Sequence, residues 1–553
     1  MPAFRPVRGT AHTTVRGPDS RRGLAMVALG SCFLVVMMDN TILNVALQTI
    51  QADLSASNGQ LQWVLDSYIL CYAALMFTAG VVADAWGRRR VLLAGLALFT
   101  VASALAAFAG SPGELVLWRA VMGVGGSVVP PVSLALINEM FDERERAKAI
   151  GVWSALGGLA IALGPLTGGV LLQYFWWGSV FLVNVPVVIV CAALLLLLVP
   201  GTRAPGRARV DVPGIVLSAA GAGLVVYAVI HAGESREWWA AGTLLPMGAG
   251  IVLLSALVWF ERRTAAPAVD VRLLRDPAFA AGTLGLALAY FALTGGTFLM
   301  VFYGQGVRGY SPLELGLVAL PIAAGTVLAA SFGGRIRDAV GVRVTVSNGL
   351  VLIGGSCLAQ AFVTAGTPLW IYELVLAASG LGMGLVLGVA TTAAMSTVPP
   401  GQAAAGAGLS NALRQIGSAL GVAVLGSAVS VAYQDRLDAV AGVLPPAVRE
   451  TTAQSLTHTF GVLDALARDP ALPSPLRDAL PGLRTLAQDA YVDAMRLGFL
   501  IASCAVGVAV VVTARWMPEP HHRPSPRALP GRVPGPDAAA ATGFSDAPQR
   551  QGV

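Results

Sequence analysis

The sequence predicts an all-α membrane protein of the transporter type, with fourteen transmembrane helices and both termini in the cytoplasm. Of its 553 residues, 56% are hydrophobic and 12% are charged, whereas soluble domains carry about 25% charged residues. Apolar runs of roughly 20 residues recur along the chain, which is the length that crosses a hydrocarbon core. The mean hydropathy of +0.71 excludes a soluble enzyme, a nucleic-acid-binding protein and a disordered protein as interpretations of the whole chain.

The apolar runs are bounded by charged or Pro/Gly-rich loops, and they are longer than barrel strands and do not alternate in polarity. The predicted spans are 24–47, 61–82, 91–110, 114–138, 149–173, 179–199, 212–231, 241–260, 278–303, 313–333, 343–366, 369–396, 408–432 and 496–515.

The net charge of +6 is explained by topology rather than by a nucleic-acid partner. Lys and Arg gather in the segments on one side of the predicted bundle, whereas the short loops on the other side hold only Arg236 and Arg308. This asymmetry places the termini inside. The predicted organisation is an N-tail 1–23, a six-helix bundle 24–199, an inserted helix pair 200–277, a second bundle 278–515 with an outside loop 433–495, and a disordered C-tail 516–553.

Motifs of enzymes and metal sites are not found in the sequence. The five cysteines lie inside apolar runs at spacings that suit neither a metal site nor a disulfide framework. No P-loop and no nucleophile elbow with triad partners occurs. We therefore expect no catalytic residue, no metal and no enzymatic activity.

An internal repeat divides the chain. The loop GVVADAWGRRR after the second span matches GRIRDAVGVR after the tenth, at one constant offset of 254 residues. This predicts two six-helix halves with spans 7 and 8 inserted between them, and parallel repeats of this kind build transporters that work by rocking. The matching pairs are Gly80 with Gly334, Asp84 with Asp338, Gly87 with Gly341, and Arg89 with Arg343.

The GVVADAWGRRR loop resembles the signature between helices 2 and 3 of the major facilitator superfamily. Three further stretches, MDNTILNVAL from Met38, LGPLTGG from Leu163 and FWWGSVFLVNVP from Phe175, are similar to motifs of its fourteen-helix drug:proton antiporters, and among these to the bacterial quaternary-ammonium and multidrug efflux group. The resemblance implies a monomeric, multi-pass plasma-membrane protein that exports hydrophobic, cationic compounds by alternating access. It also implies that the proton gradient drives transport, without a cofactor or a nucleic-acid partner.

Charged side chains inside spans are costly and are the first candidates for function. Asp39, Asp66 and Arg119 lie about 12, 8 and 8 Å below the outer surface at 1.5 Å per residue. Burial favours a neutral acid and a nearby guanidinium favours the carboxylate, so such a pair can exchange a proton. The resemblance implies proton coupling for Asp39 and Arg119 and cation recognition for Asp66, and the alternative is a buried pair that only fixes helix register.

The remaining candidates each have a structural alternative. Trp63 and Tyr68 either form part of an aromatic belt or offer ring faces to a lipophilic cation. Arg414, inside span 13, is expected to pair or to snorkel rather than to bind substrate. The resemblance further implies a conformational latch at Gly80, Asp84, Gly87 and Arg88, and an antiporter motif at Gly164, Pro165, Gly168 and Gly169.

Other functions stay open on the sequence alone. They are an exporter of one antibiotic or natural product, a lipid flippase and, from a different class, a membrane sensor that does not transport.

Overall fold

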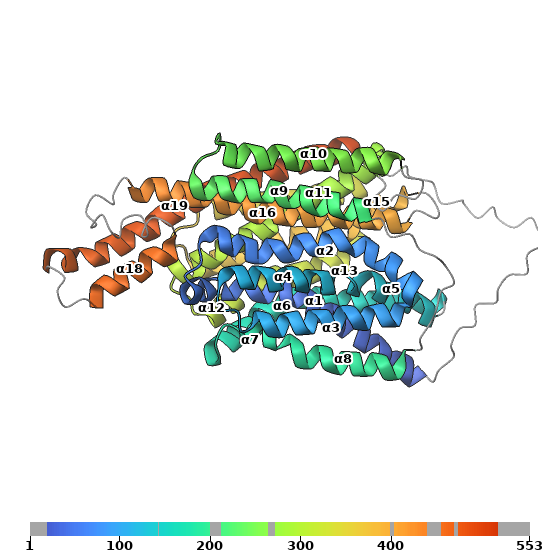
Figure 1. Cartoon of the computed structure of the whole chain (residues 1–553). Coiled ribbons are helices and arrows are strands. Elements are labelled where there is room, and N and C mark those ends of the chain that lie inside the picture. Colours follow the sequence, from blue (N-terminus) through green and yellow to red (C-terminus); the bar gives the residue numbers. More distant parts are fainter. Residues whose placement is uncertain are drawn as a thin grey trace, which may run out of the picture. The chain divides into compact units, whose positions relative to one another are not determined.

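All regular secondary structure in the described part of the chain is helical (Figure 1). The computed structural model describes residues 19–141, 143–199, 212–263, 271–398, 403–438, 455–468 and 474–517. The predicted C-tail and most of the predicted N-tail lie outside these ranges. The first half comprises α1 (Asp19–Leu54), α2 (Asn58–Trp86), α3 (Arg88–Ala106), α4 (Pro112–Gly126), α5 (Val129–Met140), α6 (Glu143–Tyr174), α7 (Ser179–Leu182) and α8 (Asn184–Leu198).

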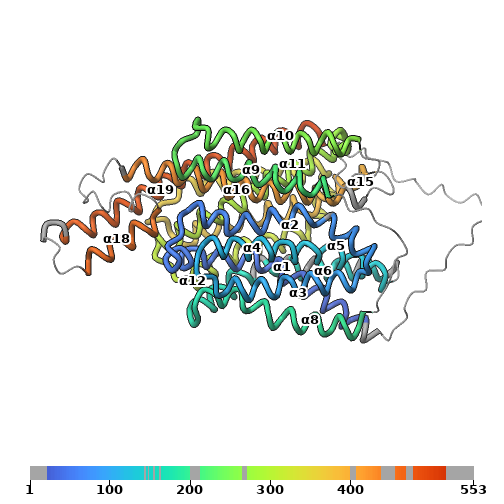
Figure 2. Tube along the Cα trace, in the orientation of Figure 1, coloured from blue at the N-terminus to red at the C-terminus, as the bar shows by residue number. Residues whose placement is uncertain are grey.

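The inserted pair and the second half follow in the same order as the predicted spans, and Figure 2 traces the path of the chain through them. The inserted pair is α9 (Val212–Ser235) and α10 (Ala241–Arg263). The second half comprises η1 (Val271–Arg275), α11 (Pro277–Val301), η2 (Phe302–Val307), α12 (Pro312–Val318), α13 (Leu320–Val340), α14 (Val342–Gln360), α15 (Leu369–Ser396), α16 (Ala403–Asp438), α18 (Leu456–Arg468) and α19 (Ser474–Trp516).

Twelve continuous helical segments of the described chain are long and apolar enough to cross a membrane. Some of them join two helices, as Pro112–Met140 joins α4 and α5. Helix α2, which bends by 52° between Met76 and Thr78, brings the number to thirteen. The remaining predicted run, 149–173, lies within α6. The multi-pass helical architecture is thus confirmed, while the count of fourteen and the cytoplasmic termini remain predictions. We call the end of the bundle at which α1 ends and α2 begins the outer end, following the predicted topology.

The repeat detected in the sequence has the same local structure in both halves. Gly87, between α2 and α3, and Gly341, between α13 and α14, have φ values of 99° and 88°, a region that favours glycine. Two residues later, Arg89 donates to the carbonyl of Val199 at 2.6 Å, and Arg343 donates to the carbonyl of Met517 at 2.7 Å. Each arginine therefore binds the end of the last helix of its own half.

The predicted outside loop 433–495 is largely made of helix extensions. Helix α16 continues to Asp438 and α19 already begins at Ser474, so the last predicted span occupies only the final part of a 43-residue helix. Between them α18 lies at the outer end, where Figure 1 shows it beside the first part of α19. Hydrogen bonds tie the start of α18 to α1, because Gln48 approaches Thr457 at 3.4 Å and Gln51 donates to Ser455 at 3.2 Å.

Helix α9 of the inserted pair contacts both halves. Glu234 accepts from the Ser57 hydroxyl at 2.5 Å and from the Gly59 amide at 3.1 Å, at the start of α2. Two residues later, Arg236 donates to Gln434 of α16 at 2.8 Å. The inserted pair is therefore docked on the first and the second half at the same end of the bundle.

Candidate functional site

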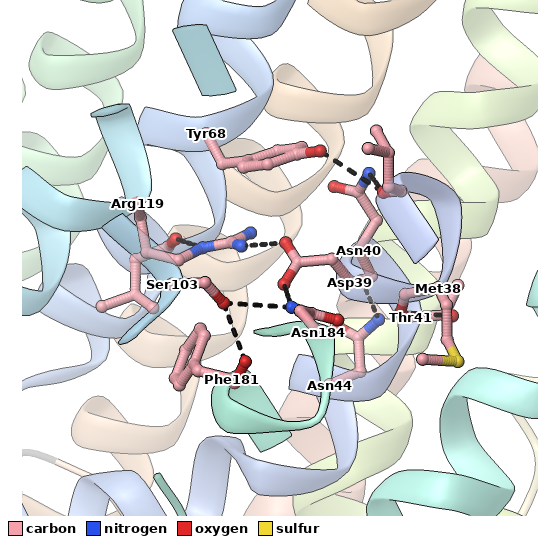
Figure 3. Close-up of polar contacts among 12 residues, drawn as sticks. Met38, Asp39, Asn40, Thr41, Asn44, Tyr68, Ser103, Arg119, Phe181 and Asn184 are labelled. Atoms are coloured by element: carbon pink, nitrogen blue, oxygen red, sulfur yellow. Dashed lines mark hydrogen bonds and ion pairs between the residues drawn. The ribbon is translucent and has the colours of Figure 1, made fainter. Parts of the chain in front are cut away.

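The two charges predicted to couple protons meet inside the first half. Asp39 of α1 and Arg119 of α4 form an ion pair through Oδ2 and Nη1, and both side chains are fully buried (Figure 3). Trp118 and Ala120 flank Arg119, whereas the polar residues Asn40 and Thr41 follow Asp39 directly. A buried pair of this kind costs desolvation energy and is weak evidence for a stabilising role.

Neighbouring groups fix the arginine from two further sides. Its Nε donates to the carbonyl of Val64 in α2 at 3.1 Å, and its guanidinium carbon lies 4.3 Å from the centre of the Tyr68 ring. Tyr68 in turn donates its hydroxyl to the carbonyl of Val36 at 3.3 Å. Arg119 Nη2 is buried and has no hydrogen-bond partner in the described part of the chain, so this nitrogen of the guanidinium is unused in this conformation.

A third group, not singled out from the sequence, completes the site. Asn184, the first residue of α8, donates to Asp39 Oδ1 at 2.9 Å and to the Ser103 hydroxyl at 3.2 Å. Ser103 donates to the carbonyl of Phe181 at 2.8 Å. A lone amide in an otherwise apolar span was the signal that could have identified Asn184.

If the chain is the exporter that the sequence resemblance implies, we expect Asn184→Ala to lower transport by at least tenfold, because a hydrogen bond to a charged group contributes about 1.5–3 kcal/mol. The measurement is initial efflux rate per membrane-inserted molecule. Asn44→Ala is the matched control, since Asn44 donates to the Asn40 carbonyl of its own helix and not to Asp39. Transport by Asn184→Ala at the control rate would contradict a role for this amide.

Asp66 does not join this cluster. Its side chain is fully buried, and neither carboxylate oxygen has a hydrogen-bond partner among the residues that the structure describes. Gln62, one turn earlier on the same face of α2, lies against Gly426 of α16. Asp66 therefore belongs to the face of α2 that looks toward the second half, whereas Asp39 and Arg119 lie within the first half. The three charges therefore form two separate sites, and the depths predicted for them stay a prediction.

The aromatic candidates separate in the same way. Tyr68 is fully buried and stacks on Arg119, on the side of α2 away from Asp66. Trp63 is half-buried and packs against the apolar core. Tyr68 is thus placed to support the ion pair.

The predicted latch residues interact within the first half. Arg88 bonds to Asp84 at 2.8 Å, to Glu139 of α5 at 2.5 Å and to the carbonyl of Ala135 at 3.3 Å. Gly87 supplies the turn, and Gly80 lies beside Pro131 of α5. These contacts hold the inner ends of α2, α3 and α5 together.

The LGPLTGG stretch of α6 packs on both halves. Gly164 and Gly168 face α1, where a side chain would collide with Thr41 and Ile42. Gly169 faces α12, and a Cβ there would lie 2.7 Å from the Leu313 Cα. From the other side of this contact, a Cβ at Gly316 of α12 would lie 2.5 Å from the carbonyl oxygen of Pro165 in α6.

Close backbone packing therefore joins the outer ends of the two halves. A further hydrogen bond runs from Gln305 of η2 to the carbonyl of Val45 in α1, at 2.8 Å. The outer side is held closed in this conformation.

Comparisons with known proteins agree with this architecture. The family model described as Major Facilitator Superfamily matches residues 29–422. The chain is 31% identical over 512 residues to "Multidrug resistance protein Stp" of Mycobacterium tuberculosis, covering 90% of this chain and 93% of that protein. It is 30% identical over 539 residues to "Tetracenomycin C resistance and export protein" of Streptomyces glaucescens, covering 95% and 98%.

Two further relatives extend the comparison. "Multidrug efflux pump LfrA" of Mycolicibacterium smegmatis is 32% identical over 508 residues, covering 91% of this chain and 99% of that protein. The solved structure of a bacterial homologue of the human lysosomal transporter Spinster aligns with a TM-score of 0.62 and 18% identity, covering 91% of this chain and 100% of that chain. The structural likeness shows the same fold.

Proposed function

Because the chain belongs to the major facilitator superfamily and is similar along most of its length to drug-efflux proteins of that family, we propose that it is a proton-coupled exporter of hydrophobic, cationic compounds. It is a multi-pass protein of the plasma membrane. The observation that supports coupling is the fully buried ion pair between Asp39 and Arg119, completed by Asn184.

Proton exchange at this pair gives the coupling step. When Asp39 takes up a proton, its charge is lost and Arg119 no longer has a carboxylate partner. The free guanidinium then seeks other acceptors, which changes how α1 and α4 pack. Loss of the proton restores the pair. The proposed cycle therefore alternates between two arrangements of one half, each favoured by one protonation state.

Asp66 is the proposed contact for the cationic group of the substrate. An ionised carboxylate without a partner is expensive inside a membrane protein, so a bound cation is stabilised there by direct pairing. The site lies on the face of α2 toward α16, where the two halves meet. Substrate and proton thus act at different places in the same half.

Ethidium efflux from cells that express the chain tests this function. We expect efflux above that of cells with an empty vector, and its collapse when a protonophore dissipates the gradient. Efflux that survives the protonophore would overturn the antiport mechanism. Absence of efflux from protein shown to be in the membrane would favour a narrow exporter of one natural product, the alternative that the tetracenomycin C relative supports.

A further inference from the structure

Arg414 is a second arginine inside a span, and its surroundings differ from those of Arg119. It lies on α16 and donates through Nη2 to the Asn411 side chain. Its Nη1 is 3.5 Å from the Tyr290 hydroxyl of α11, and its guanidinium carbon is 4.9 Å from the centre of that ring. Asn411 in turn contacts the sulfur of Met76 in α2. Arg414 therefore stands where the two halves meet.

All of these partners are neutral. Within the residues that the structure describes, Arg414 forms no ion pair, and its buried Nε has no hydrogen-bond partner. Of the two expectations for Arg414, pairing with an acid is not seen among the described residues, and snorkelling stays a prediction. A guanidinium stays charged in proteins and carries five donors, so a cation at this depth has unused capacity for an anion. The side chain is half-buried and keeps part of its surface accessible.

The opposite unpaired charge lies on the same interface. Gln62 lies against Gly426 and Met76 contacts Asn411, which sets the antiparallel register of α2 and α16. In this register Asp66 lies about 11 Å along the helix axis from Arg414, toward the outer end. Among the described residues, a carboxylate without a hydrogen-bond partner and a guanidinium without an ion pair therefore lie on one interface, about two helical turns apart along it.

We propose that Arg414, with Tyr290 and Asn411, forms an anion-binding subsite that takes the carboxylate of an amphoteric hydrophobic substrate whose cationic group pairs with Asp66. The inference rests on the proposed export function and extends its substrate class from cations to zwitterions. The planar guanidinium suits a carboxylate, because two parallel N–H donors can bind its two oxygens. The Tyr290 ring offers an aromatic face beside that contact.

A matched pair of dyes tests the subsite. One is a rhodamine with a free carboxylate, which is a zwitterion, and the other is its methyl ester, which is a cation of nearly the same shape. Uptake of each dye into inside-out membrane vesicles is measured for the wild-type chain and for Arg414→Gln, Arg414→Lys and Tyr290→Phe. Arg335→Gln is the control, since it removes an equal charge from an exposed arginine at the inner end of α13.

The readout is the ratio of carboxylate transport to ester transport, which cancels differences in expression and in coupling. We expect the ratio to fall about tenfold or more in Arg414→Gln. It should recover only in part in Arg414→Lys, which keeps the charge but not the two parallel donors. The ratio should fall less in Tyr290→Phe and stay at the wild-type value in Arg335→Gln. If Arg414→Gln does not fold, the Arg414→Lys and Tyr290→Phe ratios still test the subsite.

Other outcomes overturn the proposal. An unchanged ratio in Arg414→Gln, with or without an equal loss of both dyes, would assign Arg414 to packing or coupling. A wild-type chain that exports the ester and ignores the carboxylate would do the same. Failure to export the ester would instead count against the proposed cation export, and binding of the carboxylate dye to the purified wild-type chain and Arg414→Gln would then decide the subsite separately.

Discussion

Asp39→Asn is expected to abolish proton-coupled efflux while the protein still inserts into the membrane. The amide occupies the volume of the carboxylate but holds no charge and exchanges no proton. Arg119 is then a buried cation without its partner, and removing one member of a buried pair costs about 3–5 kcal/mol. Efflux should fall to the level of the empty vector, and thermal unfolding in detergent should occur at a lower temperature.

Two matched variants distinguish a loss of proton exchange from a loss of folding. Asp39→Glu keeps an ionisable group and should retain part of the activity. Asp53→Asn changes an acid of the same helix that accepts from Trp177 at the outer end, and it should leave efflux nearly unchanged. If Asp39→Asn retained efflux that a protonophore still abolished, the proton would bind elsewhere.

Gly169→Val is expected to reduce transport by at least tenfold by wedging the outer ends of the two halves apart. The nearest atoms to an added Cβ are the Leu313 Cα and the Pro312 carbonyl oxygen, at 2.7 and 2.8 Å. Backbone atoms cannot rotate away as a side chain can, so the two helices must separate. Overpacking typically costs about 1–3 kcal/mol, which is enough to shift the balance between two conformations of a transporter.

The shift in the balance between conformations can be measured by labelling a cysteine from the outer side of the membrane. In a chain whose five native cysteines are replaced, Gln48→Cys reports on the contact between α1 and α18. A membrane-impermeant maleimide should label it faster when Gly169→Val is added. Gly151→Val lies on the same helix with open space around it and should leave labelling unchanged. Equal labelling in both variants would show that the glycine contact does not control outer closure.

The sequence predicted the fold well because each span appears in it as an apolar run, and because the repeated loop is marked by glycines and charged residues. Asp39 and Arg119 could also be predicted as functional candidates, since charges inside spans are rare. The position of a residue in a span, however, predicts its depth in the membrane but not which neighbouring helix its side chain faces. Asp66 and Tyr68 are two residues apart and were both candidates for contact with a cation, yet they lie on opposite sides of α2.

Neutral partners and amphipathic helices gave no comparable signal. Asn184 carries no charge, so its contact with Asp39 became visible only when α1 and α8 were packed together. The length of α19 could not be read from hydropathy, because its first part is charged and lies beyond the apolar run. Arg414 was recognised as intramembrane, but whether an acid faced it depended on the register of α2 and α16.

The repeat that relates the two halves does not extend to the ion pair. At the same offset, Asp39 corresponds to Leu293 and Arg119 corresponds to Glu373, although Gly87 and Gly341 keep the same backbone geometry. The duplicated scaffold thus contains only once the charges that we propose to couple protons. On this proposal, substitutions in the second half can extend export to a new compound while the proton-coupling charges of the first half stay unchanged.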